Sequence, residues 1–258
     1  MRRTGSARPQ IPRRATETSG SPQTSEATRT SEAPQSGRAL REETQILAHE
    51  TNAAPPAIPH WDGPPLSAWR AWTPRELAAR IGSAPITWYV VGGFGIDTWI
   101  GHATRAHDDL EIAVPRASFS ALAAQLAPLA PHVVGEGEVR RLGPGGVHPA
   151  SRHQTWMLDP ETHTWRVDVM LDRGDDTTWV FRRDPTIQLP LGEAVVRRDG
   201  IPVLCPQAIL LYKAKLTRDK DEQDFEACLP RLDTPARSWL ADCLRRTHPG
   251  HDWIRRLD

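Results

Sequence analysis

Apolar and β-branched residues occur in short runs along the middle of the chain, and charged residues, glycines or prolines bound each run. Runs of this length and composition are typical of β-strands. Four of them are predicted strands: Thr87–Val91, Leu110–Val114, Thr155–Leu158 and Arg166–Leu171. The segment "AVVRRDGIPVL" predicts a hairpin, because Asp199 and Gly200 form a favoured two-residue turn between two apolar runs.

Helical patterns lie between these strands. Thr73 precedes Pro74 and Glu76, a spacing that predicts a helix start with a capping box, and this helix continues to about Ile81. Two more helices are predicted from their end residues and apolar spacing: Phe94–Ile100, which Gly101 closes, and one that Pro115 opens.

The end of the chain is predicted to be wholly helical. Its helices are expected at Pro206–Leu216, at Asp221–Leu229 and at Pro235–Arg246, the last one capped by Thr234. Strands in the middle and helices at the end predict an α+β protein, in which a mixed β-sheet with flanking helices is followed by a helical C-terminal lobe. We therefore expect one domain over residues 61–204 and a helical lobe over residues 205–258.

The composition of the first sixty residues differs from that of the rest. They contain no Phe, Trp or Tyr, so they cannot bury enough apolar surface to offset the entropy of ordering. Residues 1–60 are therefore predicted to be a disordered tail. Lys and Arg balance Asp and Glu at 32 each, which makes a nucleic-acid partner unlikely on charge alone. No apolar run approaches the length of a membrane span, and three widely spaced cysteines favour a reduced, cytoplasmic protein.

Carboxylates are clustered at the start of one predicted strand. Side chains alternate along a strand, so Asp109 and Glu111 are expected on one face and the apolar residues between and after them on the other. Asp168 has the same placement in "WRVDVML". Three carboxylates on neighbouring strands suit a site for one or two divalent cations. Taken singly, each acid is more often a solvated residue at a strand end.

A pair of glycines, Gly92 and Gly93, ends the preceding predicted strand and stands ahead of a short helix. Such a position offers backbone N–H groups to a phosphate. A dinucleotide-binding fold has similar ingredients, but the third glycine of its fingerprint is missing because Thr98 stands there. A P-loop kinase is disfavoured more firmly, since the chain has no GxxxxGK[ST] motif.

Three segments together resemble the antibiotic-type nucleotidyltransferases of the polymerase β superfamily, in particular the aminoglycoside and lincosamide adenylyltransferases. They are "GGFGIDTWIGHATRAHDDLEI", "RVDV" and "LLYKAKLTRDKDEQDF". The resemblance covers about residues 85 to 258 and implies a nucleotidyltransferase-like sheet. It implies that Gly92 and Gly93 hold the nucleotide phosphates and that Asp109 and Glu111 bind magnesium. Asp168 would then be a third metal ligand or the general base.

Two basic residues are further candidates for binding the nucleotide. Arg105 lies just before the carboxylates and is expected either to add positive charge to the site or to pair with Asp108. Lys213 lies on the predicted helix after Pro206, and only the resemblance makes it a contact of the triphosphate.

The resemblance implies an enzyme that moves a nucleoside monophosphate, AMP from ATP with Mg2+, to a hydroxyl of a small molecule such as an aminoglycoside- or lincosamide-like antibiotic. The implied partners are a nucleoside triphosphate and a hydroxylated acceptor, without a membrane. Two alternatives remain open. One is a toxin-like transferase that modifies RNA or protein, and the other is a nucleotide-binding module without catalysis.

Overall fold

A computed structural model describes residues 61, 63–143 and 145–258, all of which belong to one compact unit. The tail predicted over residues 1–60 lies outside the described residues. Among the helices described, none combines the length and the apolar composition needed to cross a membrane.

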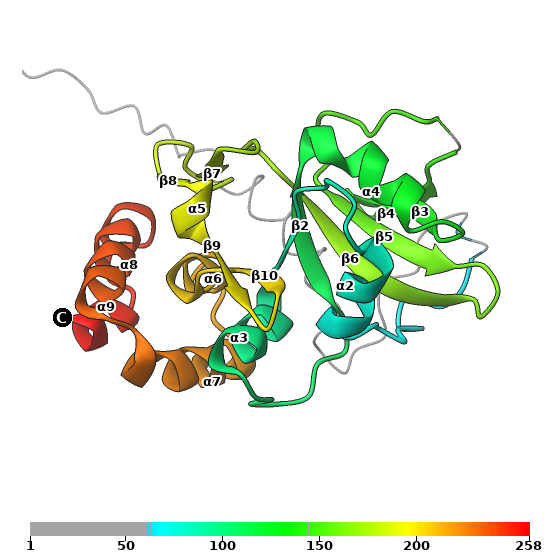
Figure 1. Cartoon of the computed structure of the whole chain (residues 1–258). Coiled ribbons are helices and arrows are strands. Elements are labelled where there is room, and N and C mark those ends of the chain that lie inside the picture. Colours follow the sequence, from blue (N-terminus) through cyan, green and yellow to red (C-terminus); the bar gives the residue numbers. More distant parts are fainter. Residues whose placement is uncertain (1–60, 62, 144) are drawn as a thin grey trace, which may run out of the picture. The chain divides into compact units, whose positions relative to one another are not determined.

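Eight strands within the described residues form one mixed sheet (Figure 1). In spatial order they are β4 (Glu138–Arg141), β3 (Ala130–Gly135), β5 (Gln154–Asp159), β6 (Thr164–Asp172), β2 (Glu111–Pro115), β1 (Tyr89–Val90), β10 (Ile201–Leu204) and β9 (Val195–Arg198). The pairs β2–β6 and β1–β10 are parallel, and the other neighbours are antiparallel. Two short strands, β7 (Thr178–Val180) and β8 (Gln188–Pro190), pair separately.

The helices are α2 (Pro74–Ile81), α3 (Gly92–Ile100), α4 (Phe119–Gln125), α5 (Leu191–Ala194), α6 (Pro206–Lys213), α7 (Asp219–Cys228), α8 (Thr234–Thr247) and α9 (Trp253–Leu257), with short 3-10 helices η2 (Arg116–Ser118) and η3 (Leu229–Arg231). The start of α2 follows the prediction, because Thr73 and Glu76 form both hydrogen bonds of a capping box. The hairpin is also confirmed: Asp199 and Gly200 have φ values of 49° and 82°, as its turn requires.

Several predicted helix ends are wrong by a few residues, including the start of α7, which is Asp219 instead of Asp221. Helix α3 begins at Gly92 instead of Phe94, since the glycines themselves form its first turn. The cap of α8 is Asp233 instead of Thr234, because the Asp233 side chain accepts a hydrogen bond from the Ala236 N–H at 2.8 Å. Helix α6 ends at Lys213, three residues before the predicted Leu216.

The two faces of the sheet pack against different helices (Figure 1). One face buries Val90, Ile112 and Val169 with the apolar sides of α2 and α4. The other face buries Tyr89 and Ala113 with α3, α6 and the C-terminal helices. The predicted fold class is therefore confirmed: an α+β protein with a mixed sheet, flanking helices and a helical C-terminal lobe.

Candidate active site

The three predicted carboxylates meet at one point of the sheet. Glu111 is the first residue of β2 and lies directly opposite Asp168 on the parallel strand β6. Asp109 lies just ahead of β2, where the Leu110 carbonyl already accepts a hydrogen bond from the Asp168 N–H at 2.8 Å. One carboxylate oxygen from each of the three residues lies within 4.8 Å of the others. The period of two along β2 turns Ile112 and Val114 to the opposite, apolar face.

The electrostatic surroundings disfavour three negative charges here. Burial, followed by the charges of Glu111 and Asp109, raises the pKa of Asp168 well above its usual range. Burial and the neighbouring Asp109 raise the pKa of Glu111 to about 7, although the Lys213 ammonium lowers it. Asp168 is only 3% exposed, and Gln154 Nε2 donates to its Oδ2 at 2.7 Å. A divalent cation would relieve this repulsion.

The donor set fits a magnesium ion. Mg2+ prefers carboxylate oxygens and is usually bound in proteins through one or two carboxylates together with substrate phosphates. Among the described residues, Asp109, Glu111 and Asp168 are the one group of three or more His, Cys, Asp or Glu side chains placed to share an ion. These residues could therefore hold the metal that the sequence predicts.

Both glycines lie in close contact with side chains of this site. Gly92 has a φ of +61°, and a Cβ atom there would lie 1.8 Å from Glu111 Oε2. A Cβ atom on Gly93 would lie 2.3 Å from His107 Nδ1 and 2.5 Å from Arg105 Nη2. The backbone of the first turn of α3 therefore lies directly against the side chains of Glu111, His107 and Arg105.

Gly92→Ala is expected to lower the free energy of unfolding by about 1–2 kcal/mol through the left-handed backbone alone, and also to displace the Glu111 carboxylate. Gly101→Ala is the matched control, because Gly101 has a φ of +94° but nothing lies within 4 Å of its added Cβ. Urea unfolding and Mn2+ titration would separate the two effects. Equal Mn2+ affinity in both variants would contradict the role of Gly92 in shaping the site.

All seven predicted site residues line one cavity of about 290 Å³. They are Gly92, Gly93, Arg105, Asp109, Glu111, Asp168 and Lys213. The floor of the cavity is the sheet face of β2, β5 and β6, and α6 forms one wall. The structure therefore brings the predicted residues together, while their individual roles stay predictions.

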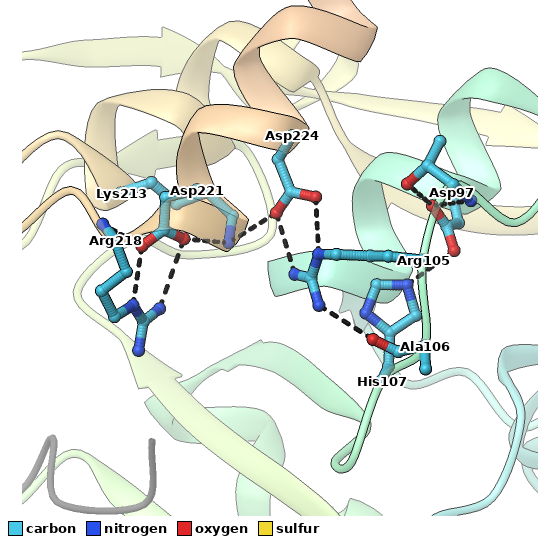
Figure 2. Close-up of polar contacts among 9 residues, drawn as sticks. Asp97, Arg105, Ala106, His107, Lys213, Arg218, Asp221 and Asp224 are labelled. Atoms are coloured by element: carbon cyan, nitrogen blue, oxygen red, sulfur yellow. Dashed lines mark hydrogen bonds and ion pairs between the residues drawn. The ribbon is translucent and has the colours of Figure 1, made fainter. Parts of the chain in front are cut away.

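Arg105 and Lys213 take part in a buried ion network (Figure 2). Arg105 donates through Nε and Nη2 to the two carboxylate oxygens of Asp224, both at 2.9 Å. Lys213 Nζ lies 2.8 Å from Asp221 Oδ1 and 2.9 Å from Asp224 Oδ2. Arg218 closes the network by donating to Asp221. Arg105 therefore pairs with Asp224. The alternative prediction that it pairs with Asp108 is wrong.

Sequence reasoning missed the acids of this network. Asp221 and Asp224 are three residues apart on α7, so they project from the same side of the helix. Neither carboxylate side chain is exposed to solvent. Their spacing within "DKDEQDF" was a usable signal, but only the fold shows that Lys213 and Arg105 lie opposite them. The network joins the loop before the carboxylates to helices α6 and α7.

A second missed pair supports the same loop. His107 Nε2 lies 2.6 Å from Asp97 Oδ2 on α3, and Asp97 Oδ1 accepts from the Thr104 N–H at 3.0 Å. The ring of Phe94 packs on the His107 ring, with centroids 4.6 Å apart. Figure 2 shows the contact between His107 and Asp97, which holds the loop before Asp109 against α3.

Comparisons with known proteins agree with the resemblance drawn from the sequence. Residues 75–140 match the family model described as Aminoglycoside-2''-adenylyltransferase, a stretch that contains Gly92, Gly93, Asp109 and Glu111. The resemblance to antibiotic nucleotidyltransferases is thus confirmed for these residues. A search of curated proteins found no significant match.

Two solved structures are similar to the chain at low identity. ANT(2'')-Ia in complex with adenylyl-2''-tobramycin is 16% identical, with a TM-score of 0.45 over 67% of this chain and 95% of that one. The lincosamide antibiotic adenylyltransferase LnuA, bound to lincomycin, is 16% identical, with a TM-score of 0.40 over 59% of this chain and 90% of that one.

Proposed function

We propose that the protein transfers a nucleoside monophosphate, AMP from ATP, to a hydroxyl group of a small molecule such as an antibiotic. The convergence of Asp109, Glu111 and Asp168 beside the glycine start of α3 is the observation that carries this proposal. The family match over residues 75–140 supports the same chemistry. We also propose that residues 61–204 act as the catalytic domain and that the helical lobe over 205–258 closes the cavity. Three buried free thiols and the need for ATP favour the cytoplasm as the place of action.

We infer a role for each residue from its position. A bound magnesium ion would neutralise the triphosphate and polarise the α-phosphate. Asp109 and Glu111 would hold that ion, and the N–H groups at Gly92 and Gly93 would bind the phosphates. Lys213 and Arg105 keep positive charge at the cavity wall, although both are shared with aspartates. Asp168 accepts the proton of the attacking hydroxyl, and Gln154 orients its carboxylate.

Magnesium is expected to raise the melting temperature more at about pH 8 than at about pH 6. The folded-state pKa of Glu111 is about 7, above its ordinary value of 4.5. The free energy of unfolding without metal therefore falls as the pH rises from about 4.5 to about 7. A cation binds the ionised carboxylates and therefore restores more stability at the higher pH. Melting curves in EDTA and in excess Mg2+ at both pH values test this. An equal shift at both would contradict the assignment of Glu111 as a ligand.

The activity itself is tested with two samples of ATP, labelled on the α- or the γ-phosphate, and a panel of hydroxylated acceptors that includes aminoglycosides and lincosamides. We expect the α-label on the acceptor and the γ-label in pyrophosphate. Label on RNA or protein would point to the toxin-like alternative, and ATP binding without pyrophosphate release would point to the non-catalytic one. Transfer of the γ-label would overturn the proposal.

A further inference from the structure

The cavity continues well beyond the carboxylates along β6. Asp168, Met170 and Asp172 lie on one face of this strand, and all three line the cavity. Four residues of strand separate Asp172 from Asp168 by roughly 13 Å. Aromatic side chains of Trp179 and Tyr212 form the walls of this far end. The cavity therefore has room for an acceptor that extends away from the reacting centre.

Two arginines, Arg182 and Arg183, line the far end. Arg183 is the more exposed of the two; its Nη1 donates to the Tyr212 carbonyl at 2.7 Å, and its guanidinium lies 5.5 Å from the centre of the Tyr212 ring. The Arg182 guanidinium has no hydrogen-bond or ion-pair partner within residues 61, 63–143 and 145–258, although its backbone N–H donates to the Tyr212 hydroxyl at 3.2 Å. Partial burial lowers the pKa of Arg182, yet an arginine stays charged.

The nearby acids offset only part of the charge of this pair. Asp172 attracts Arg182 but forms no salt bridge with either arginine within the described structure; it accepts a hydrogen bond from the Tyr89 hydroxyl, and burial raises its pKa. Asp184, the next residue along the chain, is paired with Arg246 at 3.0 Å. His153 also lines the cavity, but burial and the arginine charges lower its pKa to about 4, so it is neutral. The far end is thus electropositive.

We propose that the acceptor is an anion: a hydroxylated small molecule that carries a carboxylate or phosphate group, which Arg182 and Arg183 bind at the far end. This inference rests on the proposed function. The acceptor oxygen would form the new bond to the α-phosphorus, the bond from that phosphorus to the bridging oxygen would break, pyrophosphate would leave, and the hydroxyl proton would pass to Asp168. The length of the cavity floor puts the anionic group roughly 13 Å from that hydroxyl.

Guanidinium groups suit this role because their planar forks match carboxylate and phosphate oxygens in two hydrogen bonds. The same charges would repel a polycationic acceptor, so the far end does not favour an aminoglycoside. The nucleotide itself is a less suitable occupant. If its α-phosphorus lies at the carboxylates, its γ-phosphate is only two bridging oxygens away, well short of Asp172.

The test uses the full chain and a series of hydroxymethyl-aryl carboxylates and phosphonates of graded length, each with its neutral amide or ester. Calorimetric binding without nucleotide is measured first, followed by transfer from α-labelled ATP with Mg2+. Arg182→Gln removes the unpartnered charge, and Arg182→Lys retains a charge without the fork. Arg173→Gln is the control, because Arg173 is exposed and close in sequence but does not line the cavity.

Wild-type protein should bind at least one acid about 10- to 100-fold more tightly than its neutral counterpart. Arg182→Gln should abolish that preference with the affinity for ATP unchanged, while Arg173→Gln keeps it. The proposal is overturned if no acid is preferred, or if Arg182→Gln weakens ATP binding and leaves the acid preference intact. If Arg182→Gln abolishes the preference for the acid but no protein transfers label from ATP, the anion site is supported. Only the proposed nucleotidyl transfer is then contradicted.

Discussion

Asp109→Asn is expected to lower the rate of AMP transfer by about a thousandfold and to leave the fold intact. The substitution removes one of the proposed metal ligands, which lies just ahead of β2. A bound cation would contribute several kcal/mol of charge stabilisation in the transition state of such a reaction, which corresponds to a rate change of this order. The asparagine has the same shape and keeps one oxygen, so local packing is preserved. Stability without metal should not fall, because the charge of Asp109 raises the pKa of Glu111 and therefore opposes its ionisation.

Rates are measured as release of α-label to the acceptor at saturating Mg2+, and stability is measured by urea unfolding in EDTA. Asp176→Asn serves as the control, because Asp176 is exposed and lies outside the cavity. Transfer at the wild-type rate in Asp109→Asn would remove Asp109 from the mechanism. If Asp109→Asn instead lost much of its stability, its lower transfer rate could not be assigned to loss of the metal. Glu111→Gln would then be tested in the same assay in place of Asp109→Asn.

The carboxylate cluster could be predicted from the sequence because it depends on local rules. Alternation along a strand is fixed by backbone geometry, so Glu111 and Asp168 each had to oppose their apolar neighbours. The parallel pairing of β2 with β6 then put the two acids in register, which the sequence did not specify but the hydrophobic pattern allowed. The glycine pair was equally visible, since only close approach or an unusual backbone explains Gly92 and Gly93.

The ion network and the arginine end could not be predicted in the same way. Arg105 and Asp224 are 119 residues apart, and no local rule links them. A local partner, Asp108, was the natural alternative. Arg182 and Arg183 occur in a short segment after β7 with no recognisable motif, and they line the cavity in contact with Tyr212 of α6. Charged residues far apart in sequence are positioned by tertiary packing, which a single sequence does not reveal.

The predicted helix starts show a related limit. Glycine is a poor helix former, so a helix over Phe94–Ile100 was the sound expectation from propensity. The structure starts α3 at Gly92, and the carboxylate of Glu111 and the ring of His107 occupy the space where side chains on Gly92 and Gly93 would lie. The lack of space at the site favours glycine here, and helix propensity does not take this into account.

Asp224→Ala should lower the free energy of unfolding by about 3–5 kcal/mol, the usual consequence of removing one partner from a buried ion pair. The Asp224 side chain is 0% exposed and holds two cations, Arg105 and Lys213. Its loss leaves Arg105 without a carboxylate and Lys213 with Asp221 alone. Urea unfolding of the full chain measures the effect.

Asp242→Ala is the matched control for this prediction, because it removes an aspartate from a surface pair with Arg245 whose side chains are 67% and 46% exposed. Exposed pairs contribute little, so its stability should hardly change. A double variant, Asp224→Ala with Arg105→Leu, should recover part of the loss, since it removes one of the cations left without a partner. If Asp224→Ala lowered the free energy of unfolding no more than Asp242→Ala, the prediction would be contradicted. The ion network would then not hold α7 against the loop that carries Asp109. Retained stability together with lost transfer would then indicate that Asp224 acts by placing Lys213 and Arg105 at the cavity.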